Sequence, residues 1–508
     1  RRFPIPWRLA PALWTGIAAM ASNGSPKQID VPPPRRSRGP QLSMRPLKLY
    51  EPQLGMPTLA IVGGGFAGLA ACRRMRKRFN VVLIDAKEYF EYYPGILRAY
   101  LHPTEHNKLS ALYQPVCDAL EVRFVWGEVT KIVPETTQIM VRCMSVEKEK
   151  ESSIEYNYCI VCSGSQYGLY MASAETASSA AECLWYPTFL QHTMNSCTRW
   201  GGLDERFLSG RRAHFERELK ALKEIEKNKS TIAVVGAGFI GIEWATEVKF
   251  YLPDINVVVV EARPECVNVM PPKCRQYCQR YMEKAGIKTI YNFDYKSFLS
   301  PGESRDACDA KQLAEHGITE VARVYMAVGV RSLNQFLPVE CLDHMKYDEG
   351  TGQITRGGWI VANKSTQVLS KGERPWGDGC VFAAGNCCAV QGLCCPKNSF
   401  PGEDMAMVAC HNIEVLERRR NPKFGGCFSF LASKKFKEVH WNWGFGLCAT
   451  SLGPHDATFV AGSTEKSGSG YTVLSGCLAA YQKEFIRWSK VDQCRNGWIG
   501  WAVWGLVH

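Results

Sequence analysis

The chain contains the stretch AIVGGGFAGLAA at residues 60–71 and a closely similar stretch, AVVGAGFIGIE, at residues 233–243. Each follows an apolar run and carries glycines in the spacing G-x-G-x-x-G. In this pattern the first glycine permits a tight turn, the second lets the backbone approach a phosphate group, and the third lets a helix pack closely on a strand. The sequence therefore predicts a strand, a glycine turn and a helix at two places.

The first copy has every part of a dinucleotide-binding unit. Residues 58–62 (TLAIV) predict a strand, and a helix follows the turn over residues 67–77. The N-terminus of such a helix attracts phosphate groups. A second apolar run, NVVLID, ends in an acid that is placed to accept a hydrogen bond from a ribose hydroxyl. The predicted contacts of this copy are Gly63, Gly65, Gly68 and Asp85.

The second copy repeats these parts with a strand at 230–235, a helix at 242–252 and a strand at 255–261. Its last strand ends in a glutamate, and a carboxylate there repels the 2′-phosphate of NADPH, so NADH is expected. Arg263, two residues further on, leaves NADPH as the alternative. The predicted contacts of this copy are Gly236, Gly238, Gly241 and Glu261.

Two dinucleotide sites in one chain indicate that one nucleotide is the resident cofactor and the other visits as an electron donor. A flavin takes hydride from a nicotinamide and releases electrons singly or in pairs. We therefore expect FAD in the first site and NADH in the second.

Further stretches carry a family resemblance: EYYPGILRAYL (91–101), RFVWGEVTKI (123–132), YNYCIVCSGS (156–165), VYMAVGVRSLNQFL (324–337) and GCVFAAGNCC (379–388). From about residue 57 to at least 412 the chain resembles the FAD-dependent pyridine nucleotide-disulfide oxidoreductase superfamily. Within it, the chain is similar to type II NADH:quinone dehydrogenases and apoptosis-inducing-factor-like flavoproteins. The resemblance implies additional FAD contacts at Pro94, Val129, Ser163, Gly164, Gly385 and Asn386.

Asn386 departs from the family's second flavin motif, which normally ends in Gly-Asp. The family's aspartate accepts a hydrogen bond from the ribityl chain, and an asparagine oxygen accepts the same bond without a charge. A bond to a charged group contributes about 1.5–3 kcal/mol, against about 1 kcal/mol for a neutral pair, so FAD is expected to be held somewhat less tightly.

The resemblance also implies how electrons move. Members with a redox disulfide carry C-x4-C soon after the first motif, whereas between Gly63 and Leu109 this chain has only Cys72. Hydride is therefore expected to pass directly from nicotinamide to flavin. Glu243 matches a family glutamate near both rings that is proposed to relay protons. The alternative is a plain first-turn acid that the helix dipole favours.

The acceptor side differs from the family. Type II dehydrogenases have A-Q-x-A-x-Q at the quinone site, and residues 406–411 of this chain read AMVACH, without either glutamine. A quinone needs hydrogen-bond donors at its carbonyls, and His411 is the predicted donor. The alternative is a histidine that is satisfied within the fold.

The net charge of +12 is concentrated in a leader. Residues 1–50 contain nine Lys or Arg residues and one acid, Asp30, so the rest of the chain carries only +4. A near-neutral body argues against nucleic-acid binding. The apolar stretch LAPALWTGIAAMA, followed by a basic Pro/Ser-rich stretch, predicts targeting to a mitochondrion or plastid. The alternative is a non-native upstream region with Met44 as the start, and a cytoplasmic protein.

No run of 18 apolar residues occurs, so membrane contact is expected to be peripheral. Trp498, Trp501 and Trp504 recur every three residues in the tail, and tryptophan favours membrane interfaces. Seven Lys or Arg residues between Arg418 and Lys437 would add attraction for anionic lipid. The alternative is an aromatic helix packed on the flavin domain or in a homodimer interface.

The 22 cysteines show no regular framework. Cys159 and Cys162 form C-x-x-C, but a strand there would point them to opposite faces. The group between Cys380 and Cys395 lacks zinc-ligand spacing, and no metal site is predicted. The cysteines are interpreted as small buried hydrophobes and surface thiols in a reducing compartment.

The expected fold class is α/β, with two Rossmann-like dinucleotide-binding domains, the NADH domain inserted in the FAD domain, and a C-terminal region. The helix expected within residues 205–230 is interpreted as a solvated connector. The predicted boundaries are 1–55 for the leader, 56–165 and 346–412 for the FAD domain, 166–229 for the connector, 230–345 for the NAD(P)H domain, and 413–508 for the C-terminal region.

The predicted function is oxidation of NADH by bound FAD, without a redox disulfide, with electrons passed to a quinone at a membrane surface. One alternative is a soluble NAD(P)H-dependent reductase that uses oxygen or a protein carrier. Another is an apoptosis-inducing-factor-like flavoprotein that acts as an interaction subunit.

Overall fold

The structure is a computed structural model. It describes residues 51–143, 150–167, 181–182, 205–293, 313–318, 321–328, 330–344, 346–348, 353–394, 397, 399–422, 424, 435–440, 446–462 and 470–505. Most of the predicted leader, Cys395 and much of the predicted connector lie outside these residues.

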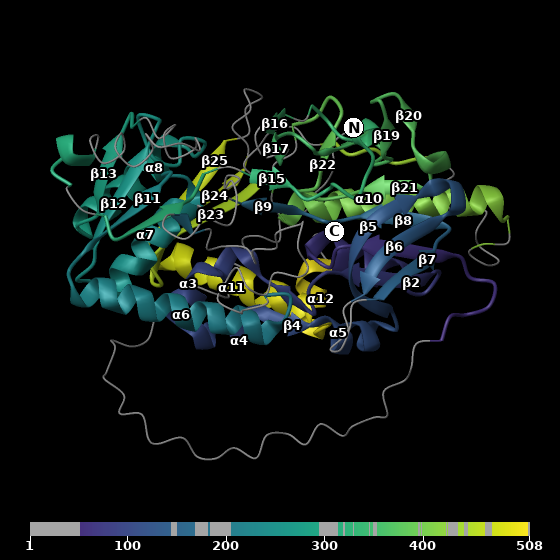
Figure 1. The fold of residues 1–508 in the computed structure, drawn as a ribbon, viewed down its shortest axis with the longest axis horizontal. Coiled ribbons are helices and arrows are strands. Elements are labelled where there is room, and N and C mark those ends of the chain that lie inside the picture. Colours follow the sequence, from purple (N-terminus) through teal and green to yellow (C-terminus); the bar gives the residue numbers. More distant parts are fainter. Residues whose placement is uncertain are drawn as a thin grey trace, which may run out of the picture. The chain divides into compact units, whose positions relative to one another are not determined.

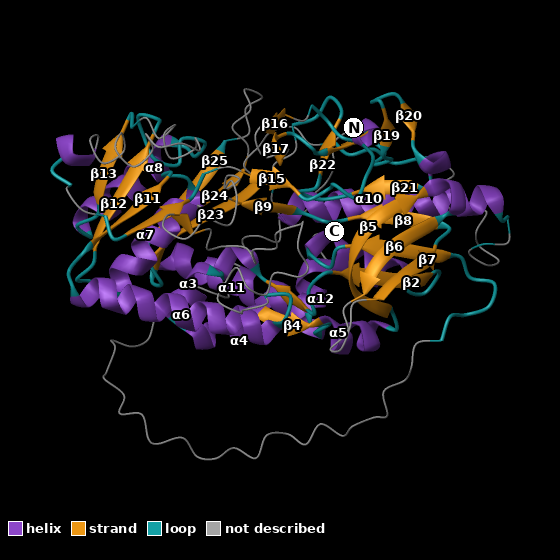
Figure 2. Ribbon diagram, in the orientation of Figure 1, coloured by secondary structure: helices purple, strands orange, loops and turns teal. Residues whose placement is uncertain are grey.

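A seven-stranded sheet forms the centre of the first nucleotide-binding domain (Figures 1 and 2). Five strands run parallel in the order β21-β8-β1-β2-β5, and β6 and β7 extend the sheet as an antiparallel edge. Residues 59–62 of β1 are all buried, as expected for a strand covered on both faces. The strands are β1 (Thr58–Val62), β2 (Asn80–Asp85), β5 (Arg123–Val133), β6 (Gln138–Cys143), β7 (Lys150–Glu155), β8 (Tyr158–Val161) and β21 (Val381–Ala383).

A second sheet has five strands, all parallel, in the order β10-β14-β11-β12-β13. These are β10 (Ala181–Glu182), β11 (Thr231–Val235), β12 (Asn256–Glu261), β13 (Lys288–Tyr291) and β14 (Arg323–Met326). The helices α7 (Phe239–Tyr251) and α8 (Pro272–Lys284) follow β11 and β12. This β-α-β arrangement is the predicted Rossmann-like unit.

The chain leaves the first sheet after β8, builds the second sheet, and returns to the first with β21. β21 pairs in parallel with β8 through Val381–Cys159, Phe382–Ile160 and Ala383–Val161. The second domain is therefore inserted into the first, which confirms the predicted fold class.

Five short two-stranded ladders accompany the larger sheets in the described residues. They pair β3 (Tyr89–Glu91) with β4 (Ser110–Leu112), β9 (Ser165–Tyr167) with β15 (Val330–Ser332), β16 (Lys346–Asp348) with β17 (Gln353–Arg356), β18 (Ile360–Ala362) with β22 (Cys388–Val390), and β19 (Leu369–Ser370) with β20 (Arg374–Pro375).

The C-terminal region is a three-stranded antiparallel sheet followed by two helices. Its elements are β23 (Gly446–Leu452), β24 (Asp456–Gly462), β25 (Tyr471–Ser475), α11 (Cys477–Cys494) and α12 (Trp498–Gly505). The small sheet docks on the second domain, where the Gly453 N–H donates to Thr246 Oγ1 at 3.1 Å. Tyr277 Oη also donates to the Asp456 carboxylate, at 2.9 Å to Oδ2.

The long helix α10 (Ser399–Arg420) packs against α2 (Phe66–Met75), the helix behind the first glycine turn. Buried Glu414 on α10 fastens the two helices, because it forms ion pairs with Arg74 at 3.2 Å and Arg78 at 3.0 Å. Glu414 also pairs with Arg418 on its own helix.

The helix α6 (Leu208–Lys227) occupies the place of the predicted solvated connector, and this interpretation was wrong. One of its faces is buried and includes Arg211, His214 and Glu218. Glu218 reaches the second sheet, where it accepts a hydrogen bond from Tyr325 Oη at 2.6 Å. The charged residues that suggested a solvated surface are instead paired inside the fold.

A buried ion network fastens α6 to the first domain. Glu91 on β3 accepts hydrogen bonds from Arg211 at 3.1 Å and 3.3 Å, and it lies 2.7 Å from His106 Nε2. Arg211 also donates to Glu205 and Tyr100, each at 2.9 Å. Burial alone would raise the pKa of Glu91, but the Arg211 charge and the His106 hydrogen bond outweigh it and lower this pKa to about 2.

We predict that Glu91→Gln destabilises the protein by about 3–5 kcal/mol at neutral pH, because it leaves the Arg211 charge buried with fewer partners. A depressed pKa in the folded state stabilises above the pKa of the unfolded state, so this contribution should fade as pH falls from about 4.5 towards 2. Urea unfolding at pH 7 and pH 3, followed by circular dichroism, measures both effects.

Glu105→Gln is the matched control, because its partner Lys108 is 60% exposed and such surface pairs contribute about 0.2–1 kcal/mol. Equal losses of stability in the two variants would contradict the assigned role of Glu91.

Candidate functional site

The predicted nucleotide contacts of the first domain follow the carboxyl ends of adjacent parallel strands. Gly63 follows β1, Asp85 ends β2, Ser163 follows β8, and Gly385 follows β21. Carboxyl ends of parallel strands meet at one edge of a sheet, which is where ligands bind in open α/β folds. The topology therefore gathers these four positions at one edge.

The first glycine turn has almost no free space around two of its glycines. A Cβ on Gly68 would lie 1.9 Å from the Gly63 carbonyl oxygen, and one on Gly63 would lie 2.3 Å from the Cys162 carbonyl oxygen. Gly63 also has φ +100°, a conformation that glycine adopts at low cost. The absence of side chains here lets α2 begin directly against the end of β1.

The second turn has the same construction. A Cβ on Gly241 would lie 1.8 Å from the Gly236 carbonyl oxygen, and Gly236 has φ +105°. The middle glycines differ from the outer ones in both copies: Gly65 and Gly238 have no atom within 4 Å of a Cβ position. The open space beside them fits the predicted approach of a pyrophosphate.

Matching carboxylates brace the two turns. Asp85 Oδ2 accepts the Gly64 N–H at 2.7 Å, and Glu261 Oε2 accepts the Ala237 N–H at 2.7 Å. The other oxygen of each acid accepts the N–H two residues further along the chain, at 2.8 Å for Asp85 and 3.1 Å for Glu261. Each acid therefore shapes its turn and also places negative charge beside it.

Two helix N-termini meet at the first site. A Cβ on Gly402, in the first turn of α10, would lie 3.1 Å from Gly385 Cα, and one on Gly385 would lie 3.4 Å from Ala67 Cβ at the start of α2. Helix N-termini carry partial positive charge, so both helices favour an anion here. Gly402 was missed in the sequence because no spacing rule links it to the first motif.

Hydrogen bonds within the protein hold the predicted FAD contacts Ser163 and Asn386 in place. Ser163 Oγ donates to Asn334 Oδ1 at 2.8 Å, and Asn334 Nδ2 donates to the Cys387 carbonyl at 2.9 Å. Lys397 Nζ donates to the Asn386 carbonyl at 3.2 Å. The two bonds of Asn334 connect the turn after β8 with the turn after β21. Val129 lies on β5 at an irregularity in its pairing with β6.

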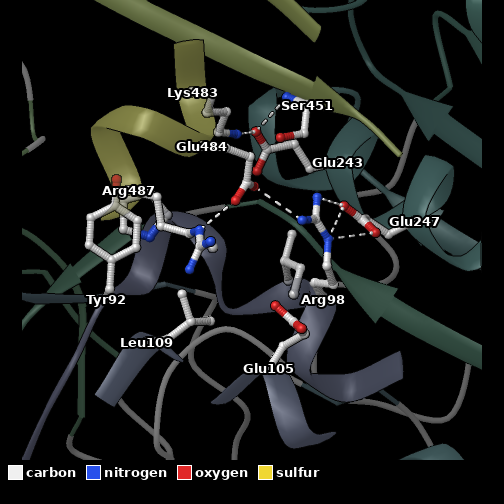
Figure 3. A pocket seen from close by; sticks show the side chains of 13 residues that line it. Tyr92, Arg98, Glu105, Leu109, Glu243, Glu247, Ser451, Lys483, Glu484 and Arg487 are labelled. Carbon is white, nitrogen blue, oxygen red and sulfur yellow. Dashed lines mark hydrogen bonds and ion pairs between the residues drawn. The ribbon is translucent and has the colours of Figure 1, made fainter. Parts of the chain in front are cut away.

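A small pocket lies where three parts of the chain meet (Figure 3). The first domain contributes Tyr92, Pro94 and Gly95 from the predicted flavin-side stretch, together with Leu97, Arg98, Glu105 and Leu109. The second domain contributes Glu243 and Glu247 from α7. The C-terminal region contributes Ser451, Lys483, Glu484 and Arg487.

Glu243 lies in the first turn and a half of α7, directly behind the second glycine turn. Its Oε1 accepts the Ser451 N–H at 2.8 Å and forms an ion pair with Lys483 Nζ. The side chains of this ion pair are only 15% exposed for Lys483 and 12% for Glu243. The carboxylate is thus fixed in the pocket by two donors from the C-terminal region.

A chain of ion pairs also lines the pocket. Arg98 pairs with Glu247 at 2.8 Å and with Glu484 at 3.1 Å, and Glu484 pairs with Arg487 at 2.6 Å. Burial alone would raise the pKa of Glu484, but the charges of Arg487 and Arg98 lower it. In Figure 3 these pairs link α3 (Leu97–Leu101), α7 and α11.

Local sequence patterns contain little indication of the residues that line this pocket. Glu247 follows Glu243 by one helical turn, and Arg98 lies in the flavin-side stretch, so their positions in the sequence hinted weakly that they line the pocket. Ser451, Lys483, Glu484 and Arg487 lie more than 200 residues away from Glu243 in sequence, and no local pattern connects them.

His411 does not line this pocket. It lies on α10, where its Nε2 is 3.2 Å from the Lys435 carbonyl oxygen, and burial lowers its pKa. Its predicted role towards a quinone remains a prediction.

The described cysteines are free thiols. Cys72 lies buried within α2, and burial raises the pKa of its thiol, so it stays protonated at neutral pH. Cys159 and Cys162 are both buried, and their thiols also have raised pKa values. A raised pKa suppresses the thiolate that disulfide exchange requires.

We predict different outcomes for alanine at the two kinds of glycine. Gly68→Ala should lose bound FAD and lower the thermal midpoint, because its Cβ would push α2 away from the sheet. Gly65→Ala should also lose FAD, but without FAD its midpoint should equal that of the FAD-free wild type, because nothing in the protein contacts its Cβ position. Flavin absorbance per protein and thermal unfolding check both. Full flavin content in Gly65→Ala would contradict a pyrophosphate at this turn.

The second copy provides an internal comparison. Gly241→Ala should keep its flavin but bind NADH about 5- to 150-fold more weakly, since forcing an extra methyl into a packed site costs roughly 1–3 kcal/mol. Calorimetric titration with NADH measures this. Loss of flavin from Gly241→Ala would show that the two sites do not act separately.

Comparisons with known proteins agree with this architecture. Ferroptosis suppressor protein 1 of Xenopus laevis is 22% identical over 424 residues, covering 81% of this chain and 96% of that protein. The Xenopus tropicalis protein is 25% identical over 235 residues, so that this chain spans about half (51%) of its length. The external NADH-ubiquinone oxidoreductase 2 of Saccharomyces cerevisiae mitochondria is 22% identical over 44% of this chain and 41% of its own.

Among solved structures, NDH2 from Plasmodium falciparum in complex with NADH shares the fold, with a TM-score of 0.56 and 12% identity over 85% of this chain and 94% of its own. The model of the pyridine nucleotide-disulphide oxidoreductase family matches residues 57–409. This chain therefore belongs to the pyridine nucleotide-disulphide oxidoreductase family, and FAD and NADH, the cofactors predicted from its two glycine turns, are those of the family.

Proposed function

We propose that this protein oxidises NADH with bound FAD and passes the electrons to a quinone at a membrane surface. One observation carries the proposal. Pro94, expected beside the flavin, and Glu243, expected beside the nicotinamide, line the same pocket although they come from different domains. Groups held side by side in one pocket react as if at very high concentration, which favours direct transfer.

Each cofactor has residues that fit it. The turn at Gly63–Gly68, the N-termini of α2 and α10, and the turns after β8 and β21 would hold FAD. When bound, FAD supplies the capacity to accept a hydride and release electrons. The turn at Gly236–Gly241 would hold NADH, and Glu261 places negative charge where NADPH carries its 2′-phosphate.

A quinone is the acceptor that the relatives favour, since the yeast relative's name specifies ubiquinone. His411 contributes a hydrogen bond to a quinone carbonyl only if its Nε2 leaves the Lys435 carbonyl. The proposal of a quinone therefore rests on the relatives more than on His411.

The membrane part of the proposal rests on an exposed apolar surface. Leu478, Tyr481, Phe485 and Trp488 recur at helical spacing on the outer face of α11, and Tyr481 is 70% exposed. Trp498 and Trp501 on α12 are 78% and 52% exposed. We name these six residues the outer apolar face. Tyrosine and tryptophan favour a lipid interface, where the ring is apolar and the polar atom stays wet.

Trp504 is not part of this face. It is buried, its Nε1 donates to Ser489 Oγ at 3.2 Å, and Lys490 Nζ lies 4.1 Å from its ring centre. The prediction that all three tryptophans form a surface is therefore wrong for Trp504, which packs α12 against α11.

No helix among the described residues has the length and apolar character needed to cross a bilayer. We propose a peripheral location in a mitochondrion or plastid.

The deciding experiment mixes the purified protein with NADH without oxygen and follows bleaching of the yellow flavin. A short-chain ubiquinone or plastoquinone is then added. We expect NADH to bleach the flavin and quinone to restore it. Gly241→Ala is the control, because it should keep the flavin but be bleached more slowly when NADH is below saturation.

Other results identify the alternatives. Bleaching that oxygen reverses and quinone does not would support a soluble reductase with another acceptor. A flavin that NADH leaves yellow would reject the dehydrogenase and favour an interaction subunit.

Membrane binding is tested by flotation with vesicles that contain anionic lipid. Trp498→Ser should weaken binding by roughly tenfold or more, because withdrawing a large apolar side chain costs about 1.5 kcal/mol or more. Val339→Ser is the control, since Val339 is 64% exposed on a separate element. Unchanged flotation combined with dissociation of a dimer would identify the outer apolar face as a homodimer interface.

A further inference from the structure

The helix α11 has two faces with different chemistry. Its outer face carries the apolar residues 478, 481, 485 and 488, whereas its inner face carries Lys483 and Arg487, which line the pocket. At 3.6 residues per turn, these two sets lie on opposite sides of the helix. The family model ends at residue 409, so the pocket is completed by a part of the chain that lies beyond it.

Lys483 holds one particular group in the pocket. Its Nζ contacts Glu243 Oε1, the same oxygen that accepts the Ser451 N–H. With two donors on one oxygen, the carboxylate has little freedom to rotate. Figure 3 shows Glu243 between α11 and Ser451, facing the interior of the pocket.

The position of Glu243 gives this contact its significance. Glu243 lies two residues after Gly241, so it is tied to the turn that would hold NADH. It lines the pocket together with Pro94, which comes from the flavin-side stretch. A misplacement of about 1 Å in such a site slows a reaction by roughly 100-fold. A residue that fixes Glu243 therefore bears on hydride transfer.

We propose that Lys483 is a positioning residue for NADH oxidation, which acts by holding the Glu243 carboxylate. This inference rests on the proposed function. It assigns a role to a lysine in the C-terminal region, more than 200 residues away from the NADH-binding turn. Without Lys483, Glu243 would keep the Ser451 bond but gain rotational freedom, and its charge would lack a counter-ion.

A purely structural role for Lys483 is a weaker explanation, because α11 has other attachments. Lys490 pairs with Glu403 on α10 at 2.5 Å, and both side chains are almost fully buried. Arg495, next to the end of α11, donates to the Asn107 and Ser110 carbonyls at 2.6 Å and 2.7 Å. Glu484 pairs with Arg98. Loss of Lys483 alone should leave α11 in place.

The test is a double-mutant cycle of wild type, Lys483→Met, Glu243→Gln and the double variant, all with FAD bound. Three quantities are measured: the rate of flavin bleaching at saturating NADH, the affinity for NADH by calorimetry, and the thermal midpoint. Lys483→Arg tests rescue by a conserved charge. Lys220→Met, an exposed lysine in the middle of α6, is the control for loss of a positive charge.

We expect Lys483→Met to slow bleaching by roughly 30-fold, within the range that misplacement produces, while NADH affinity and the thermal midpoint change little. Lys483→Arg should recover most of the rate, and Lys220→Met should match the wild type. In the Glu243→Gln background, Lys483→Met should have little further effect, because residues that act through one contact are not additive.

Several results would overturn the inference. Equal slowing by Lys483→Met in both backgrounds would show that it does not act through Glu243. A large fall in the thermal midpoint, or in NADH affinity with an unchanged rate, would assign it a structural or binding role. A wild-type protein that NADH does not bleach would instead reject the proposed function, and the positioning role with it.

Discussion

The close contact between a helix and the end of a strand is the constraint on which this fold depends. In each glycine turn, a carbonyl oxygen lies within about 2 Å of the point where any side chain on the third glycine would begin. Only glycine permits this approach, and the approach aims the first N–H groups of α2 and α7 at the edge where the strands end. This geometry places the start of each helix directly against the end of the strand that precedes it.

Positive and negative partial charges lie at different places around the two glycine turns. Two helix N-termini, those of α2 and α10, make the first site favourable for phosphate groups. The carboxylates of Asp85 and Glu261 hold each turn from its far side, through the N–H groups of Gly64 and Ala237. Because each acid is already bonded to its turn, the negative charge beside each nucleotide is part of the scaffold. The proposed selection against the 2′-phosphate of NADPH would thus come from Glu261, the same residue that holds the second turn.

Local sequence patterns predicted the parts of this protein that depend on near neighbours. The two glycine motifs and their acids were readable because each signal lies within a short stretch, whereas the insertion of one domain in the other was implied by the family resemblance. The sequence predicted a solvated α6 because its charged residues have no partners nearby in sequence. In the fold, Arg211, His214 and Glu218 are paired with residues of other segments, namely Glu91, Glu205 and Tyr325. Trp498 and Trp504 share one spacing but differ in exposure, since only contacts with α11 decide which of them is covered. Lys483 and Ser451 meet Glu243 through tertiary packing that no spacing encodes.

The helix α11 lies between the pocket and the outer apolar face, so it could couple binding at one to binding at the other. Its inner residues touch both nucleotide domains, while its outer residues face away from them. A rigid helix transmits any displacement to both sides, so a surface that shifts α11 on docking would change the affinity of the pocket. Thermodynamic linkage makes this effect reciprocal: occupation of the pocket would alter the strength of docking by the same factor. If the outer apolar face docks on a surface as proposed, docking and nucleotide binding would therefore be coupled through α11.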